Sequence, residues 1–300
     1  MTIKLSSPAT HQFWEIPVLY EDEHLLALAK PAGMLTSPNR NAGDQPSLMA
    51  LLHAGVTAGK PWAAERHLTY LANVHRLDPE TSGVLLLARS KPALMKLASF
   101  LGSEQPCQKY LVLVQGTPAE DRFEVDAKLA AVSVPQSLGG DPPPPDPGEP
   151  GQSSPDTMPK AYVDSRHGKR ARSVFLVRER FPRWTLLECQ PLTTRPHQLR
   201  AHLRYVRLPI AGDSLYGGRS LWLSRLKPGY RLKPKHTERP LLGQPLLHLA
   251  ELTFPHPVTG QPVTVTAPLL PKDLEVALKY LRRYGNEERG APEAPEASEA

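Results

Sequence analysis

Asp78 lies where an apolar stretch meets a tight turn, in the segment His75–Gly83 (HRLDPETSG). Pro79 removes one backbone donor and fixes the chain direction, and Gly83 permits a positive φ or the close approach of another segment. An aspartate in this setting can be held rigidly with one face of its carboxylate open. The local sequence by itself favours a simpler role, in which Asp78 caps the turn or the element that follows it.

A second group of polar residues lies in the segment Thr194–His202 (TRPHQLRAH). At helical spacing His197 and Arg200 lie near one face, with Arg204 one turn further. A guanidinium at such a position can form two hydrogen bonds to a carboxylate or a phosphate, although an exposed basic helix face is the alternative. His197 and His202 are five residues apart and share no helical face, so we expect no metal site here.

The stretch Arg219–Arg239 combines basic and aromatic side chains. Basic residues neutralise phosphates and aromatic rings stack on bases, so this composition is typical of a nucleic-acid contact. A long polar loop is the alternative interpretation. The basic and aromatic residues are Trp222, Arg225, Lys227, Tyr230, Arg231, Lys233, Lys235 and Arg239.

The elements that must position these residues mix helices and strands without strict βαβ alternation. This order predicts an α+β fold around a large, mixed and mostly antiparallel sheet that is flanked by helices and loops. Helical spacing predicts helices at Gln45–Ala58, Pro92–Leu101, Gln198–Val206 and Leu274–Tyr284. Apolar runs predict strands at Val18–Tyr20, Leu25–Ala29, Val84–Ala88, Lys109–Gln115, Ala171–Val177, Trp184–Pro191, Leu246–Phe254 and Val263–Ala267.

We expect one catalytic domain over residues 17–285, preceded by a loose lead-in at residues 1–16. The segment 136–159 is rich in Pro, Gly, Asp and Ser and cannot bury enough apolar surface to offset its ordering entropy. We therefore expect a disordered insert there. The tail 286–300 carries five Glu and one Arg, and we expect it to be disordered as well.

The net charge of +6 understates how basic the rest of the chain is, because much of the acidic charge lies in the tail and in the Pro-rich segment. A basic folded body suggests a polyanionic partner such as nucleic acid, although a solvated basic surface is the alternative. Neither a membrane-spanning apolar run nor a Gly-rich nucleotide loop is present in the sequence, and the N-terminus lacks a signal-peptide pattern. The two cysteines fit no metal spacing, so we expect a reduced cytoplasmic protein, although one disulfide remains an alternative. We also expect the protein to be a monomer.

Five segments, in order along the chain, resemble the motifs of the RluA-type RNA pseudouridine synthases. HRLDPETSG resembles the family signature HRLDxxTSG. The match runs from about Val18 to Leu270, and because it begins so early we expect no separate N-terminal RNA-binding module. The other four segments are LAKPAGMLTSP at Leu28–Pro38, KYLVLVQG at Lys109–Gly116, RPHQLRAHL to LPIAGDSLYGG at Arg195–Gly218, and LLHLAELTFPHPVTG at Leu246–Gly260.

The resemblance implies the pseudouridine synthase catalytic fold and an enzyme that isomerises uridine in structured ribosomal or transfer RNA, with base flipping and with neither a metal nor another cofactor. It implies Asp78 as the catalytic carboxylate, Arg200 as its ion-pair partner and Tyr110 as the ring that packs on the target uracil. It also implies that Arg76 fills the space left by the flipped uridine. Further substrate-binding residues by resemblance are His75, Thr81, Arg195, His197 and Lys30.

Two positions depart from the family pattern, with Thr194 and Arg207 where glycine is usual. They bear on the local backbone and on substrate fit rather than on the class of enzyme. Two other functions are alternatives to this one. A non-catalytic RNA-binding protein would have no physical need for a buried Asp–Arg pair, and a hydrolase that uses Asp78 would need a nucleophile elbow or metal spacing that the sequence lacks.

Overall fold

The computed structural model describes residues 1–39, 45–103, 107–131, 161–232, 236–268 and 271–285. The Pro-rich segment 136–159 and the acidic tail 286–300, both predicted to be disordered, lie outside the described residues. So do Lys233 and Lys235 of the basic and aromatic stretch.

Strands form most of the molecule. They are β1 (Thr2–Ser7), β2 (Gln12–Glu21), β3 (Leu25–Lys30), β4 (Ala72–Asn73), β5 (Ser82–Ala88), β6 (Gln108–Gln115), β7 (Arg122–Asp126), β8 (Leu129–Ala131), β9 (Ala161–Val163), β10 (Arg172–Phe181), β11 (Trp184–Pro191), β12 (Leu247–Pro255) and β13 (Pro262–Thr266). Among them, β8 and β9 form a separate antiparallel pair.

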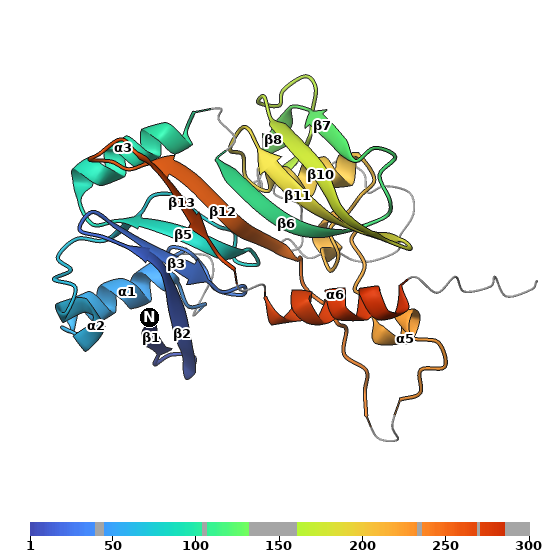
Figure 1. Ribbon diagram of the computed structural model, residues 1–300, viewed down its shortest axis with the longest axis horizontal. Coiled ribbons are helices and arrows are strands. Elements are labelled where there is room, and N and C mark those ends of the chain that lie inside the picture. Colours follow the sequence, from blue (N-terminus) through green and yellow to red (C-terminus); the bar gives the residue numbers. More distant parts are fainter. Residues whose placement is uncertain (40–44, 104–106, 132–160, 233–235, 269–270, 286–300) are drawn as a thin grey trace, which may run out of the picture.

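The other strands form one 11-stranded sheet in the order β1-β2-β3-β5-β12-β6-β11-β10-β7, with β13 on β12 and β4 on β5. Within it β5 and β12 pair in parallel, and the other neighbours pair antiparallel. The predicted α+β class with a mixed, mostly antiparallel sheet is therefore confirmed. Figure 1 shows β5, β12 and β6 near the middle of the molecule.

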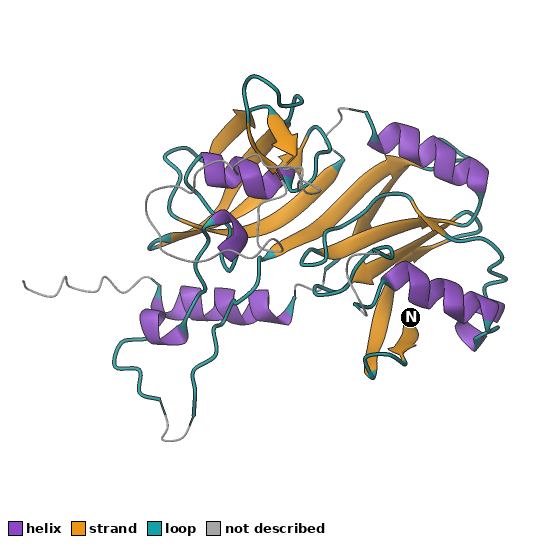
Figure 2. Cartoon of the chain, turned by 180° about the vertical axis from the view of Figure 1, so that it is seen from behind, coloured by secondary structure: helices purple, strands orange, loops and turns teal. Residues whose placement is uncertain are grey.

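Helices cover both faces of this sheet (Figures 1 and 2). They are α1 (Leu48–Thr57), α2 (Pro61–Ala64), α3 (Lys91–Leu101), α4 (Gln198–Tyr205), α5 (Leu223–Leu226) and α6 (Lys272–Tyr284), with a 3-10 turn at Ser214–Tyr216. The predicted helices match α1, α3, α4 and α6, with ends that differ by one to three residues. No described helix is long and apolar enough to cross a bilayer.

The buried strand β5 shows why its sequence is apolar throughout. Leu85 and Leu87 pack in the cluster that includes α1, whereas Val84 and Leu86 pack in the cluster that includes α3. Because successive side chains of a strand point to opposite faces, a strand covered on both faces needs apolar residues at every position. Asp78 lies in the turn just before this central strand.

The expectation of a loose lead-in at residues 1–16 is wrong. Residues 2–7 form β1, which pairs antiparallel with β2 from Thr2 opposite Pro17 to Ser7 opposite Gln12. Ile3 and Leu5 are buried and alternate with exposed residues, which is the period-two pattern of a half-buried strand. This short alternation was overlooked because polar residues surround it.

Candidate active site

The turn that carries Asp78 is anchored where β5 meets β12. Ser82 and Gly83 pair in parallel with His248 and Leu249. Gly83 has a φ of +115°, and a Cβ built on it would lie 2.2 Å from the Leu249 carbonyl oxygen. Only glycine combines this backbone conformation with such a close approach, so both roles expected of Gly83 are confirmed.

The Lys30 side chain supports the backbone of the turn that contains Asp78. Its Nζ donates hydrogen bonds to four backbone carbonyl oxygens, those of Pro31 (2.9 Å), Asp78 (3.3 Å), Pro79 (3.2 Å) and Thr81 (2.7 Å). The Lys30 side chain is 1% exposed. Burial lowers the pKa of Lys30 to about 7, against the attraction of two nearby carboxylates, Asp78 and Glu80. Lys30 therefore fixes the backbone of the turn, and its expected contact with RNA stays a prediction.

A second clamp comes from the segment after Lys30. The Thr36 hydroxyl donates to the Leu77 carbonyl (2.8 Å) and accepts from the Leu77 amide (3.1 Å). The Gly33 amide donates to the Pro79 carbonyl (2.8 Å). The residues on both sides of Asp78 are thus held by backbone hydrogen bonds, which leaves the carboxylate itself to face the opposite wall.

The side of the site that faces the Asp78 turn is formed by helix α4 and by the segment that contains Asp213 and Tyr216. Arg200, 3% exposed, donates from Nε and Nη2 to the two carboxylate oxygens of Asp213, each over 2.7 Å. The Tyr216 ring lies over the guanidinium, with its centroid 4.9 Å from Cζ. A two-point hydrogen bond of this kind fixes the plane of the guanidinium. Its remaining nitrogen, Nη1, lies 3.7 Å from Glu80 Oε2.

Asp78 faces this wall with a side chain that is 35% exposed, and its Oδ2 lies 3.7 Å from His197 Nε2. The His197 ring is oriented by Tyr216, whose hydroxyl lies 3.1 Å from Nδ1. The same hydroxyl also lies 3.2 Å from both the amide nitrogen and the carbonyl oxygen of Ala161, so the phenol is held in place by the backbone. The turn and α4 thus meet around one half-open carboxylate.

Tyr110 lies on β6, beside Leu249 of β12 and Cys189 of β11. Its side chain is buried, and its hydroxyl donates to Gln108 Oε1 (3.0 Å). Burial, and secondly the negative charge of Asp78, raise the pKa of Tyr110 above its usual value. Tyr110 is therefore a neutral phenol near pH 7, close enough to Asp78 to sense its charge.

Two more residues expected to bind substrate make contacts within the fold. The Nε2 of His75 accepts a hydrogen bond from the Leu86 amide (3.1 Å), and burial lowers the pKa of His75 to about 4. Thr81 is 3% exposed, with its amide bonded to Asp78 and its carbonyl to Lys30. His75 thus supports β5 through the Leu86 amide, and the backbone of Thr81 supports the turn, while contact of either side chain with the substrate stays a prediction.

The arginines of the expected set lie in different settings. Arg76 is exposed next to the catalytic turn. Arg195 is half-buried, and it donates to the carbonyls of Arg170 (3.1 Å) and Thr194 (3.2 Å). Arg200 pairs with Asp213 through two hydrogen bonds and also interacts electrostatically with Asp78, so its expected pairing with Asp78 stays a prediction.

Sequence reasoning missed three members of this site, Asp213, Tyr216 and Glu80. The first two were quoted within the matched segment LPIAGDSLYGG but were given no role. The signal available in the sequence was that Asp213 directly follows the apolar run PIAG. The structure shows that this aspartate is fully buried, and a buried carboxylate needs a cationic partner. Glu80 lies two residues after Asp78, and nothing in its local sequence distinguishes it.

Comparisons with known proteins agree with this geometry. The family described as RNA pseudouridylate synthase matches residues 24–205. The ribosomal large subunit pseudouridine synthase D of Xylella fastidiosa is 33% identical over 285 residues, which are 93% of this chain and 73% of that protein. The synthase C of Escherichia coli is also 33% identical, over 88% of this chain and 70% of that protein.

A solved structure supports the fold. Human RNA pseudouridylate synthase domain containing 4 aligns with a TM-score of 0.59 and 24% identity, over 88% of this chain and 92% of that one. The family match covers more than half of the chain, and it includes the Asp78 turn, β6 and α4. The protein therefore belongs to the RNA pseudouridylate synthase family and is an RNA pseudouridine synthase.

Proposed function

We propose that this enzyme isomerises specific uridines of large-subunit ribosomal RNA, with Asp78 as the catalytic carboxylate. The choice of RNA rests on relatives that are named ribosomal large subunit pseudouridine synthases. The role of Asp78 rests on one observation: its carboxylate is half-open, while the backbone on both sides of it is clamped. A rigid carboxylate with an accessible face suits a reaction at the ribose or the base.

The reaction breaks the bond between N1 and C1′ and forms a bond between C5 and C1′, while C5 loses a proton and N1 gains one. The target base must leave its stack to reach Asp78, because the reacting atoms are hidden within a stacked strand. We propose that the uracil then lies against the buried Tyr110 ring, since the neutral phenol offers an apolar face. We propose that Arg76, which is exposed, occupies the space that the base vacates.

Arg200 and His197 are basic groups beside Asp78 during these steps. Arg200 and His197 both lie on the wall that Asp78 faces. Asp213 accepts both hydrogen bonds of the two-point pair with Arg200, which fixes the plane of the guanidinium on that wall. We propose that this wall orients the half-exposed Asp78 carboxylate toward the substrate.

We further propose a cytoplasmic place of action and a monomeric state. Both described cysteines, Cys107 and Cys189, are unpaired, which agrees with a reducing compartment.

Mapping of pseudouridine in cellular RNA tests the proposed substrate. Ribosomal and transfer RNA would be analysed by mass spectrometry from a strain that lacks the gene, with wild-type or Asp78→Asn complementation. We expect a large-subunit RNA site that disappears in the deletion strain and returns only with the wild type. Loss of a transfer RNA site alone would overturn the assignment of the RNA but keep the reaction.

A further inference from the structure

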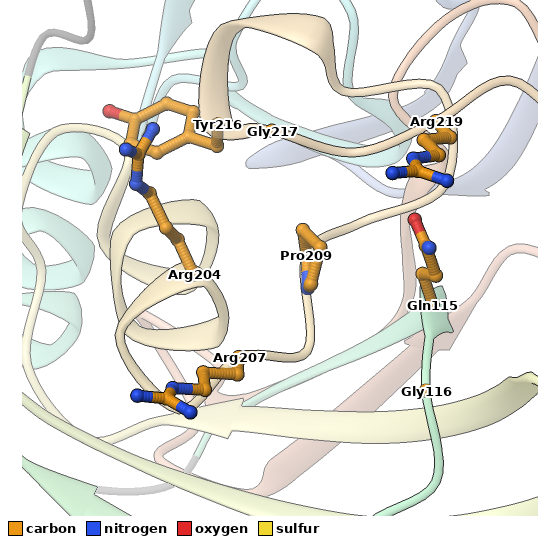
Figure 3. A pocket seen from close by; sticks show the side chains of 8 residues that line it. All are labelled: Gln115, Gly116, Arg204, Arg207, Pro209, Tyr216, Gly217 and Arg219. Atoms are coloured by element: carbon orange, nitrogen blue, oxygen red, sulfur yellow. The ribbon is translucent and has the colours of Figure 1, made fainter. Parts of the chain in front are cut away.

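A basic pocket opens at the far end of α4 from His197 (Figure 3). Its cavity has a volume of about 430 Å³. Three arginines belong to the wall: Arg204 in the last turn of α4, Arg207 in the loop after it, and Arg219 beyond the 3-10 turn. The other lining residues are Gln115, Gly116, Pro209, Tyr216 and Gly217.

The three arginines lack acidic partners. Among the described residues no carboxylate lies within ion-pair distance of Arg204, Arg207 or Arg219. Arg178 and Arg282 show the contrast, since each pairs with a glutamate. Three arginines in its wall give the cavity a positive charge, which favours the binding of an anion there.

Arg207 adds a second argument because its backbone is strained. Its φ of +60° lies in the left-handed region, which glycine adopts freely and other residues adopt at a cost. Arginine departs from the family motif that this segment resembles, in which glycine is usual at this position. A charged side chain at an unfavourable backbone position points to a use for that charge.

Gln115 supplies a neutral polar group to the same cavity. It lies at the end of β6, and its Oε1 is buried without a hydrogen-bond partner among the described residues. The Gln115 side chain and the Arg219 guanidinium face one another in Figure 3. An amide oxygen left unsatisfied in this way is costly, and a bound group or water that bridges to Arg219 would satisfy it.

The pocket is connected to the active site through Tyr216. One part of this residue lines the pocket, while its ring covers Arg200 and its hydroxyl orients His197. Arg204 follows Arg200 by one helical turn, a rise of about 6 Å. An RNA strand with its target uridine at Asp78 can therefore extend along α4 to the pocket.

We propose that Arg204, Arg207 and Arg219 bind a backbone phosphate of the RNA, at a nucleotide outside the one that reacts. This inference rests on the proposed function for its ligand class. Guanidinium groups match the geometry of phosphate oxygens and release counterions when they bind. The pocket thus sets which strand direction fits along α4, and it does not take part in the chemistry.

Binding of an unmodified large-subunit ribosomal RNA transcript tests the proposal. All proteins carry Asp78→Asn, so that no turnover occurs. The test variant adds Arg207→Gly and Arg219→Gln, and the control adds Arg122→Gln on the edge strand β7. Gly suits the backbone at 207, so the test variant is expected to fold. Fluorescence anisotropy would give the Kd at several salt concentrations.

We expect the test variant to bind about tenfold more weakly and to lower the slope of log K against log salt by about 1, the effect of one lost phosphate contact. An affinity and a slope equal to those of the control would overturn the proposal. A third outcome is that the variant loses binding of inorganic phosphate while its RNA affinity stays unchanged. That result would assign the pocket to a small anion and would also overturn it.

Activity separates this proposal from the proposed function. With Asp78 intact, the two pocket substitutions should raise KM for the transcript and leave kcat at saturating RNA within about twofold. If the wild type forms no pseudouridine but the binding loss occurs, the proposed substrate is wrong and the pocket still binds RNA. If pseudouridine forms with an unchanged KM in the variant, the proposed function stands and the pocket assignment fails.

Discussion

Arg200 donates two hydrogen bonds of 2.7 Å to Asp213, and both side chains are almost completely buried. Asp78, the carboxylate that the sequence motif singles out, is 35% exposed and lies 3.7 Å from His197. The buried pair thus gives the site its rigidity, and the half-open carboxylate remains available to a substrate. Stability and catalysis are assigned to different aspartates.

This division predicts that two isosteric substitutions lower the free energy of unfolding by very different amounts. Asp213→Asn leaves the buried Arg200 charge without its partner, and we expect a loss of about 3–5 kcal/mol in the free energy of unfolding. Asp78→Asn removes a half-exposed charge and should change stability by less than about 1 kcal/mol. Urea denaturation of both variants measures the difference. Equal losses would mean that Arg200 depends as much on Asp78 as on Asp213.

Lys30 should matter for the stability of the Asp78 turn. Lys30→Met keeps an apolar stem of similar length but removes the donor to four carbonyl oxygens. We expect a loss of about 3 kcal/mol or more, because buried carbonyls are left unsatisfied. Lys279→Met on the exposed side of α6 is the matched control and should change little. A stable Lys30→Met protein with normal kcat would show that the clamp is dispensable.

The lowered pKa of His75 predicts that the folded protein loses stability in mild acid. Burial lowers the folded-state pKa of His75 to about 4, below its ordinary value of 6.5. The unfolded chain therefore binds this proton first, so the stabilisation is complete above pH 6.5 and is lost as the pH falls toward 4. The slope from this one group reaches at most about 1.4 kcal/mol per pH unit.

Urea denaturation between pH 7 and pH 4.5 measures this effect. His75→Gln can still accept from the Leu86 amide through its side-chain oxygen, and it should flatten the pH dependence. Exposed His236→Gln is the control and should leave the wild-type curve unchanged. An identical pH dependence in wild type and His75→Gln would show that His75 does not resist protonation in the folded state.

Local sequence patterns predicted much of the fold. The glycine at 83 was expected to permit a positive φ or a close approach, and the structure has both. The helix predicted at Gln198–Val206 is α4, which ends at Tyr205. Both features depend on neighbouring residues, which a sequence displays directly. The short strands β7, β8 and β9 were missed, because β7 has few apolar residues and β8 and β9 are only three residues long each.

Local sequence patterns could not predict contacts between segments that lie far apart in the sequence. Lys30 was expected to bind substrate, but its acceptors lie 48 to 51 residues further along the chain. Arg200 was expected to pair with Asp78, because the family resemblance supplied that partner. The competing carboxylate, Asp213, lies 13 residues away across a loop, and only the folded chain shows that it reaches the guanidinium first.

The most direct test of the account is pseudouridine formation by the purified protein on an unmodified transcript of large-subunit ribosomal RNA. Mass spectrometry would count the pseudouridine formed by wild type and by Asp78→Asn, at RNA concentrations that saturate both. The account predicts a modified uridine with the wild type, and none with Asp78→Asn although that variant binds the transcript with similar affinity. Equal pseudouridine formation by the two proteins would contradict the catalytic role of Asp78.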